Sequence, residues 1–128
     1  MSVYVTKVAV TTAGGDGSAV GEAYSASPLN GEVYALRVDW HASAPATSDI
    51  DVVVESDANR PEVVLYDKDD AKDDLWVYPQ VQATSTAGAA ITGAYQRLLA
   101  NGRIKVNVAG CNALAPAVTV YVFVKEVR

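Results

Sequence analysis

Apolar and polar residues alternate along most of this chain at every second position, and not at the spacing of an amphipathic helix. A clear stretch is residues 118–125, in which four valines alternate with threonine, tyrosine, phenylalanine and lysine. Successive side chains of a strand point to opposite faces, and valine favours a pleated, half-buried surface. The pattern therefore predicts an all-β domain whose strands have one buried face.

Glycine, proline, serine and asparagine divide this pattern into short segments. The segments predicted as strands are residues 3–11, 19–26, 32–42, 49–56, 62–67, 75–84, 103–108 and 118–125. Proline cannot donate to a sheet ladder, so we expect Pro79 at an edge or a bulge. About eight short strands predict one antiparallel β-sandwich, jelly-roll-like, over residues 1–128.

Residues 32–42 form the strongest predicted strand. The face expected to be buried carries Tyr34, Leu36, Val38 and Trp40. The opposite face carries Arg37, Asp39 and His41. Because Trp40 shares its face with apolar residues, we expect it in the core and not as a platform for a ligand.

Residues 89–100 leave two interpretations open. Helical spacing is seen at Ile91, Ala94, Tyr95, Leu98 and Leu99. Asn101-Gly102 would end such a helix well. The glycine at position 93, the β-branched residues and the neighbouring strands favour extended structure.

The length of 128 residues is that of one domain, and half of the residues are hydrophobic. A single apolar core is then sufficient to stabilise the fold, and we expect no disulfide, no metal and no other cofactor. The net charge of −5 opposes binding to nucleic acid or to anionic lipid. No apolar run approaches the roughly 18 residues that span a bilayer, and the first residues do not resemble a secretion signal.

The candidate catalytic residues are few. Asp39, His41 and Ser43 form the one triad-like string, but i, i+2 spacing on one strand does not aim a base at a nucleophile. Cys111 lies among small residues without a flanking cation, which predicts an inert thiol. We therefore expect that the protein is not an enzyme.

Two loops are candidate ion sites. The acidic loop at residues 67–74 offers calcium ligands at Asp67, Asp69, Asp73 and Asp74, but it lacks the glycine and the glutamate of a calcium-binding loop. The alternative is an exposed charged loop that protects neighbouring edges from aggregation. Glycines 14, 15 and 17 offer either an anion-binding nest or a flexible hairpin connection.

Three blocks of sequence carry a resemblance to a known group of proteins. They are residues 29–41 (LNGEVYALRVDWH) with 45–49 (PATSD), residues 75–79 (LWVYP) with 86–90 (TAGAA), and residues 102–106 (GRIKV) with 119–121 (TVY). Over residues 29–125 the chain resembles small virion proteins of tailed bacteriophages, of the capsid decoration or cement type built on a β-sandwich.

The resemblance implies a non-enzymatic structural protein that stabilises the outer surface of a phage capsid by bridging capsomers. Its implied partners are the major capsid protein and further copies of itself, as a trimer or dimer. It would be made in the cytoplasm of the bacterial host, where the absence of disulfides is expected. The alternative is a glycan-binding or host-adhesion module, a head-fibre base or a tail component, with exposed aromatics at Trp76 and Tyr78.

The first predicted strand is a candidate interface because it is apolar on both faces. Its candidate contact residues are Val3, Tyr4, Val5, Val8 and Val10, and Trp76 and Tyr78 are further interface candidates elsewhere in the chain. A free edge that is this apolar would otherwise promote aggregation. The alternative is that the strand is central and buried.

Overall fold

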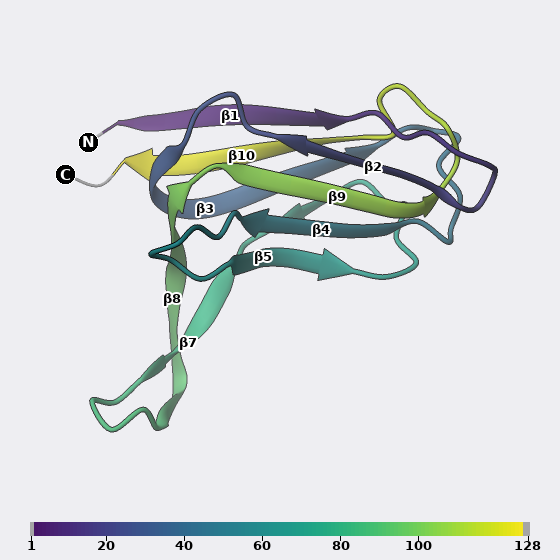
Figure 1. The fold of residues 1–128 in the computed structure, drawn as a ribbon. Helices are drawn as coiled ribbons and strands as arrows, with labels where there is room; N and C mark the ends of the chain where they lie inside the picture. The colour runs from purple at the N-terminus through teal and green to yellow at the C-terminus, as the bar shows by residue number, and fades with distance from the viewer. Residues whose placement is uncertain (1, 127–128) are drawn as a thin grey trace.

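The computed structural model describes residues 2–126, which form two antiparallel sheets packed face to face (Figure 1). Its strands are β1 (Val3–Val10), β2 (Ala19–Tyr24), β3 (Leu29–Trp40), β4 (Asp49–Val54), β5 (Val63–Lys68), β6 (Leu75–Val77), β7 (Gln80–Thr84), β8 (Ala90–Gly102), β9 (Ile104–Cys111) and β10 (Val118–Glu126). The prediction of an all-β sandwich is confirmed. Within the described residues, no helix is long and apolar enough to cross a membrane.

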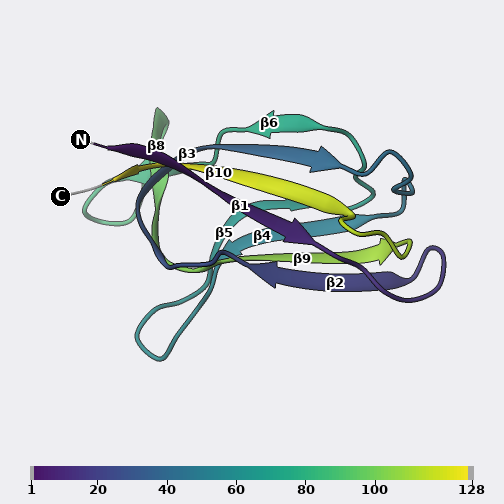
Figure 2. The ribbon, with the colours of Figure 1, turned by 90° about the horizontal axis from the view of Figure 1, so that it is seen from above.

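The order of the strands is that of a jelly roll. One sheet has the order β1-β10-β3-β8-β7, with β6 as an additional neighbour of β3, and the other has the order β2-β9-β4-β5. Most connections cross from one sheet to the other, so strands distant in sequence become neighbours. Figure 2 shows the two layers from above, with β6 beside β3.

The core lies between the two sheets, and the predicted alternation places residues in it correctly. The four valines of β10 at positions 118, 120, 122 and 124 are fully buried, and so are Ile104 and Val106 of β9. Trp40 also lies in this core, as predicted. Each such side chain stabilises the fold by roughly 1.5–3 kcal/mol relative to an exposed one, so the core needs no disulfide.

A β-bulge overturns the prediction that Tyr34 faces the core. The pairing of β10 with β3 shifts between Phe123 and Val124, which pair with Ala35 and Val33. Tyr34 is the extra residue between Val33 and Ala35. One extra residue shifts the alternation by one position, so the residues before it point to the face opposite to the one predicted. Val33 is therefore buried, and the Tyr34 ring lies on the outer face, 5.9 Å from the ring of Phe123.

Residues 29–31, which precede the predicted strand at residues 32–42, belong to β3 because two strands pair with them. Leu29 pairs with Gly102 of β8, and Gly31 pairs with Glu126 of β10. A side chain at position 31 would place its Cβ only 2.3 Å from the carbonyl oxygen of Lys125. Glycine is thus required there by the close approach of the two backbones, and not by a turn.

The segment predicted as one strand over residues 75–84 is two strands. It breaks at Tyr78-Pro79, so Pro79 lies between β6 and β7 and outside both ladders, and not at an edge or a bulge within one strand as expected. Residues 90–102 are extended as β8, so the strand interpretation of this region is confirmed and the helical one is wrong.

The β7–β8 hairpin projects away from the sandwich (Figure 1). The last part of β8, residues 98–102, pairs with residues 29–33 of β3 and anchors the hairpin in the sheet. Its earlier part pairs with β7 as far as Gln80↔Arg97. We call the projecting part, residues 80–97, the arm.

Candidate functional site

The triad-like residues do not form a relay. The carboxylate of Asp39 accepts a 2.7 Å hydrogen bond from Nε of Arg37. Nδ1 of His41 accepts a hydrogen bond from the backbone N–H of Ser43, at 2.9 Å. Asp39 and His41 thus have separate partners. Cys111 is buried in the core, as expected for a structural thiol.

The four acidic residues proposed as calcium ligands are separated by the fold. Asp67 lies on β5, directly opposite Asp51 of β4, whereas Asp74 accepts a hydrogen bond from the backbone N–H of Trp40. Among residues 2–126, no group of three or more histidine, cysteine, aspartate or glutamate residues is placed to hold a metal ion. Among these residues the structure therefore does not support the calcium interpretation of Asp67, Asp69, Asp73 and Asp74, and it leaves the alternative of an exposed charged loop.

The Asp51–Asp67 pair instead forms the centre of an acidic surface on the four-stranded sheet. Partial burial raises the pKa of Asp51 from 3.8 to about 6, and the hydrogen bond with Asp67 and its negative charge act in the same direction. Asp69 and Glu62 add smaller repulsive contributions. This surface repels anions.

The glycine loop is a hairpin connection, and one of its glycine amides is bonded to the protein itself. Ala13 and Val20 form a β-bridge across it, and the backbone N–H of Gly17 donates a 2.9 Å hydrogen bond to the side-chain oxygen of Asn112. An amide that an anion would need is thus occupied by the protein itself.

The candidate interface residues of β1 divide between the two faces of the strand. Val3 and Val5 are exposed on the outer face, while Val8 and Val10 are 1% and 0% exposed. Tyr4 packs partly against the core, and its hydroxyl accepts a hydrogen bond from the backbone N–H of Asn30. The prediction is therefore wrong for the side chains of Val8 and Val10. The alternative of a central strand is also wrong, because β1 lies at the edge of its sheet.

An aromatic stripe crosses the outer face of the same sheet, formed by Tyr34, Trp76 and Phe123. The rings of Trp76 and Phe123 are 5.3 Å apart, and the guanidinium of Arg37 lies 5.6 Å from the centre of the Trp76 ring. Trp76 is 49% exposed, and the nearby Tyr78 is 63% exposed. Sequence reasoning identified both residues, but it missed the stripe because it placed Tyr34 on the wrong face.

The arm and its base expose apolar side chains to solvent. Val81 and Ile91 are exposed, Tyr95 is 60% exposed, and Leu99 at the base is 61% exposed. Arg97 is the one charged residue between positions 75 and 102. Sequence reasoning noticed Ile91, Tyr95 and Leu99 but did not predict that they are exposed together, because their helical spacing obscured their place on a strand.

A polar hollow lies where β8 leaves the arm and enters the sandwich. It has a volume of about 440 Å³ and is lined by Pro28, Glu55, Ser56, Asp57, Arg60, Asn101, Gly102 and Arg103. A second, mainly apolar hollow of about 150 Å³ shares Glu55, Arg60 and Asn101 with it. Val54, Pro61, Val63 and Leu99 complete this second hollow.

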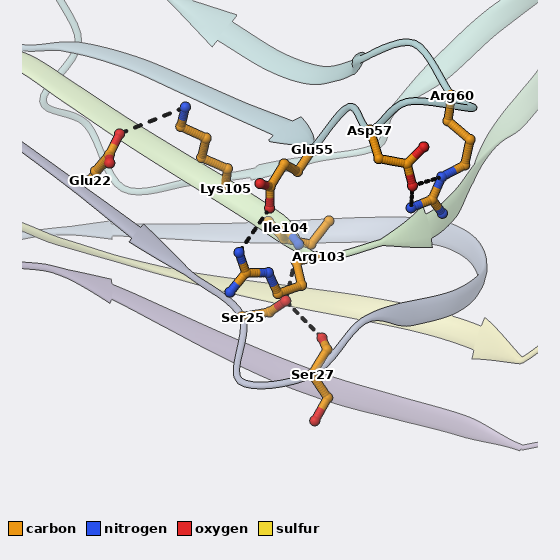
Figure 3. A network of polar contacts seen from close by, with 9 residues as sticks. All are labelled: Glu22, Ser25, Ser27, Glu55, Asp57, Arg60, Arg103, Ile104 and Lys105. Carbon is orange, nitrogen blue, oxygen red and sulfur yellow. Dashed lines mark hydrogen bonds and ion pairs between the residues drawn. The ribbon is translucent and has the colours of Figure 1, made fainter.

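Two arginine–carboxylate pairs, Arg103 with Glu55 and Arg60 with Asp57, line the polar hollow (Figure 3). The guanidinium of Arg103 lies 3.2 Å from a carboxylate oxygen of Glu55 and 4.4 Å from the centre of the Tyr24 ring. Nε of Arg60 donates a 2.9 Å hydrogen bond to Asp57. This hydrogen bond and that from the backbone N–H of Asn59 lower the pKa of Asp57. Sequence reasoning missed the hollow, because its residues come from segments that are far apart in the chain.

Comparison with known proteins identifies no family and no relative. No family of known sequences matches the chain, and no curated protein matches it. Solved structures with a similar shape include carbohydrate-binding modules. A CBM32 module of AlyQ in complex with 4,5-unsaturated mannuronic acid is 12% identical with a TM-score of 0.44, covering 87% of this chain and 74% of that module.

Two further modules are similar at the same level. CpGH89CBM32-4 from Clostridium perfringens, in complex with GlcNAc-α-1,4-galactose, is 14% identical with a TM-score of 0.48, covering 95% of this chain and 88% of that one. A point mutant of the family 29 module CBM29-2 is 8% identical with a TM-score of 0.41, covering 98% of this chain and 92% of that one. Similarity at these scores carries no argument about what the chain binds.

Proposed function

We propose that the chain is a non-catalytic structural protein of a tailed-phage particle, which decorates the outer surface of the capsid and contacts its protein partner through the arm. The partner is the major capsid protein, and the protein acts as a homo-oligomer, a dimer or a trimer. The resemblance of residues 29–125 to capsid decoration proteins supports this proposal.

The observation that carries the proposal is the arm. A hairpin that leaves the body of the sandwich has little of its own core, yet it presents Val81, Ile91 and Tyr95 to solvent. Exposed apolar residues concentrated in one element are typical of a contact with another protein. β7 is also the end strand of its sheet, so its free backbone groups are available for strand addition.

The distribution of charge also supports a contact through the arm. All fifteen acidic residues lie outside positions 75–125. An arm with a single arginine approaches other acidic copies with less repulsion than the rest of the surface. Many copies on one particle would add their small contacts together.

The test is co-sedimentation of the protein with phage heads that lack it. We expect saturable binding at a fixed ratio to the capsid protein, and loss of binding in the double variant Ile91→Lys, Tyr95→Lys. The matched control is Val20→Lys, which adds a lysine at an exposed valine of β2 in the other sheet. Equal binding by the control and the arm variant would overturn the role of the arm, and no binding by the native protein would overturn the proposal.

A second candidate function is a glycan-binding or host-adhesion module. The specific observation that favours it is the aromatic stripe, in which Trp76 is exposed, with the exposed Tyr78 beside it, because aromatic rings can stack on the apolar faces of sugars. A glycan array tests it, with Trp76→Ala as the variant expected to lose binding at the stripe.

A further inference from the structure

We propose that the polar hollow binds a neutral saccharide, with the apolar hollow beside it covering a C–H face of the sugar. This inference rests on the second candidate function and gives it a different site, at the base of the arm instead of on the aromatic stripe.

The size and position of the hollow suit a small ligand. Its volume of about 440 Å³ falls within the range of roughly 300–1,000 Å³ found for ligand pockets. It lies between the turn at residues 57–60 and the junction of β8 with β9. Its walls therefore come from the loop that follows β4 and from the point where the chain passes from one sheet to the other.

The charges that line the hollow select a neutral ligand. Arg60 and Arg103 balance Asp57 and Glu55, and each arginine is already paired with one of these carboxylates. A phosphate or sulfate would meet two carboxylates, and a cation would meet two guanidinium groups. Hydroxyl groups both donate and accept, so they can bond to either member of an ion pair without a change in net charge.

The donors that would contact a sugar are held in place before it binds. The guanidinium of Arg103 is fixed by Glu55 and by the face of Tyr24, and its hydrogen bond to Glu55 uses one of its five N–H groups. Arg60 is fixed by Asp57, and it lies against Gly102, where a Cβ would be 3.2 Å from its guanidinium. Side chains that are already ordered lose less entropy on binding.

The neighbouring hollow supplies the apolar half of a sugar site. Val54, Pro61, Val63 and Leu99 line it, and Glu55, Arg60 and Asn101 line both hollows. A pyranose ring has apolar C–H faces and a polar rim of hydroxyls. The charged and amide side chains of the polar hollow would face the hydroxyls, and the apolar side chains of the second hollow would face the C–H groups. A bound sugar would also cover the exposed Leu99.

The experiment is an array of neutral and acidic oligosaccharides, followed by calorimetric titration of the sugars that bind. We expect neutral sugars to bind, and Arg103→Ala and Asn101→Ala each to weaken them about tenfold or more. The matched control is Lys105→Ala. Lys105 lies on β9, close to Arg103 in the sequence. Its ammonium is 3.7 Å from Glu22 and 5.9 Å from the Tyr24 ring centre, and it does not line the hollow. We expect it to bind like the native protein.

The possible failures are distinguishable. Loss of binding in Trp76→Ala with full binding in Arg103→Ala and Asn101→Ala would overturn the hollow and keep the glycan-binding function. No binding to any sugar would overturn both, and binding of acidic sugars alone would overturn the argument from charge. A thermal melt of each variant tests whether it is folded. If Arg103→Ala is unfolded, the binding of Asn101→Ala tests the site instead, because Asn101 is exposed and its substitution should not disturb the fold.

Discussion

The backbone N–H of Trp40 donates a 2.6 Å hydrogen bond to a carboxylate oxygen of Asp74. This contact ties the end of the acidic loop to the last residue of β3, whose indole is buried in the core. The backbone N–H of Ala71, in the same loop, donates a further bond to the carbonyl of Ser48. The acidic loop is therefore part of the folded body, and Asp74 has a structural role.

We expect Asp74→Ala to lower the free energy of unfolding by about 1–3 kcal/mol, because it removes a charged acceptor from a backbone N–H at the edge of the core. Urea denaturation followed by tryptophan fluorescence measures the change. The control is Asp73→Ala, which removes the neighbouring exposed carboxylate. Equal destabilisation by both variants would show that the loop contributes through its charge and not through this bond.

The raised pKa of Asp51 makes a prediction about pH. The folded protein binds this proton more tightly, at a pKa of about 6, than the unfolded chain does at 3.8. The protonated Asp51 therefore stabilises the folded protein below pH 3.8, and this contribution is lost as the pH rises through about 6. We expect Asp51→Asn to stabilise the protein above pH 6 and to have little effect at pH 4.

The expected gain from Asp51→Asn is about 1 kcal/mol or less, because solvent screens a pair at the surface. Thermal melts at pH 4 and pH 7.5 measure it, with Asp16→Asn in the exposed glycine loop as the control. A gain of the same size at both pH values would contradict the assignment to this carboxylate.

The two faces of β1 predict opposite results for the same substitution. Val8→Lys places a charge in the core and should cost on the order of several kcal/mol, enough to unfold a marginal domain. Val5→Lys lies on the exposed face and should leave the thermal midpoint nearly unchanged. Circular dichroism of both variants measures the difference, and a folded Val8→Lys protein would contradict the burial of this face.

Ser25 makes a buried polar contact that is separate from the hollow beside it (Figure 3). Its hydroxyl donates to the carbonyl of Ser27 at 2.8 Å and accepts from the backbone N–H of Ile104 at 3.0 Å. We expect Ser25→Ala to cost about 1–3 kcal/mol, since it leaves the N–H of Ile104 without this acceptor. Chemical denaturation measures it against Ser18→Ala at an exposed serine, and a cost no larger than that of the control would contradict the role of this hydroxyl.

Local pattern was sufficient to predict the sandwich and most of its core. The alternation in residues 104–108 and 118–124 places each valine and isoleucine on a buried face, because the pleat of a strand fixes the direction of each side chain relative to its neighbours. Where a bulge inserts a residue, as at Tyr34, the same rule fails, since the bulge depends on the partner strand β10.

The sequence by itself therefore determined that this protein is a β-sandwich, where most of its strands lie and that its acidic residues lie away from positions 75–125. Only the tertiary structure decided that β1 is an edge strand, that residues 80–97 project as an arm, and that Glu55, Arg60 and Arg103 meet in one hollow. The physical reason is that alternation is a property of neighbouring residues, whereas edges, arms and hollows arise from pairing between segments far apart in the chain.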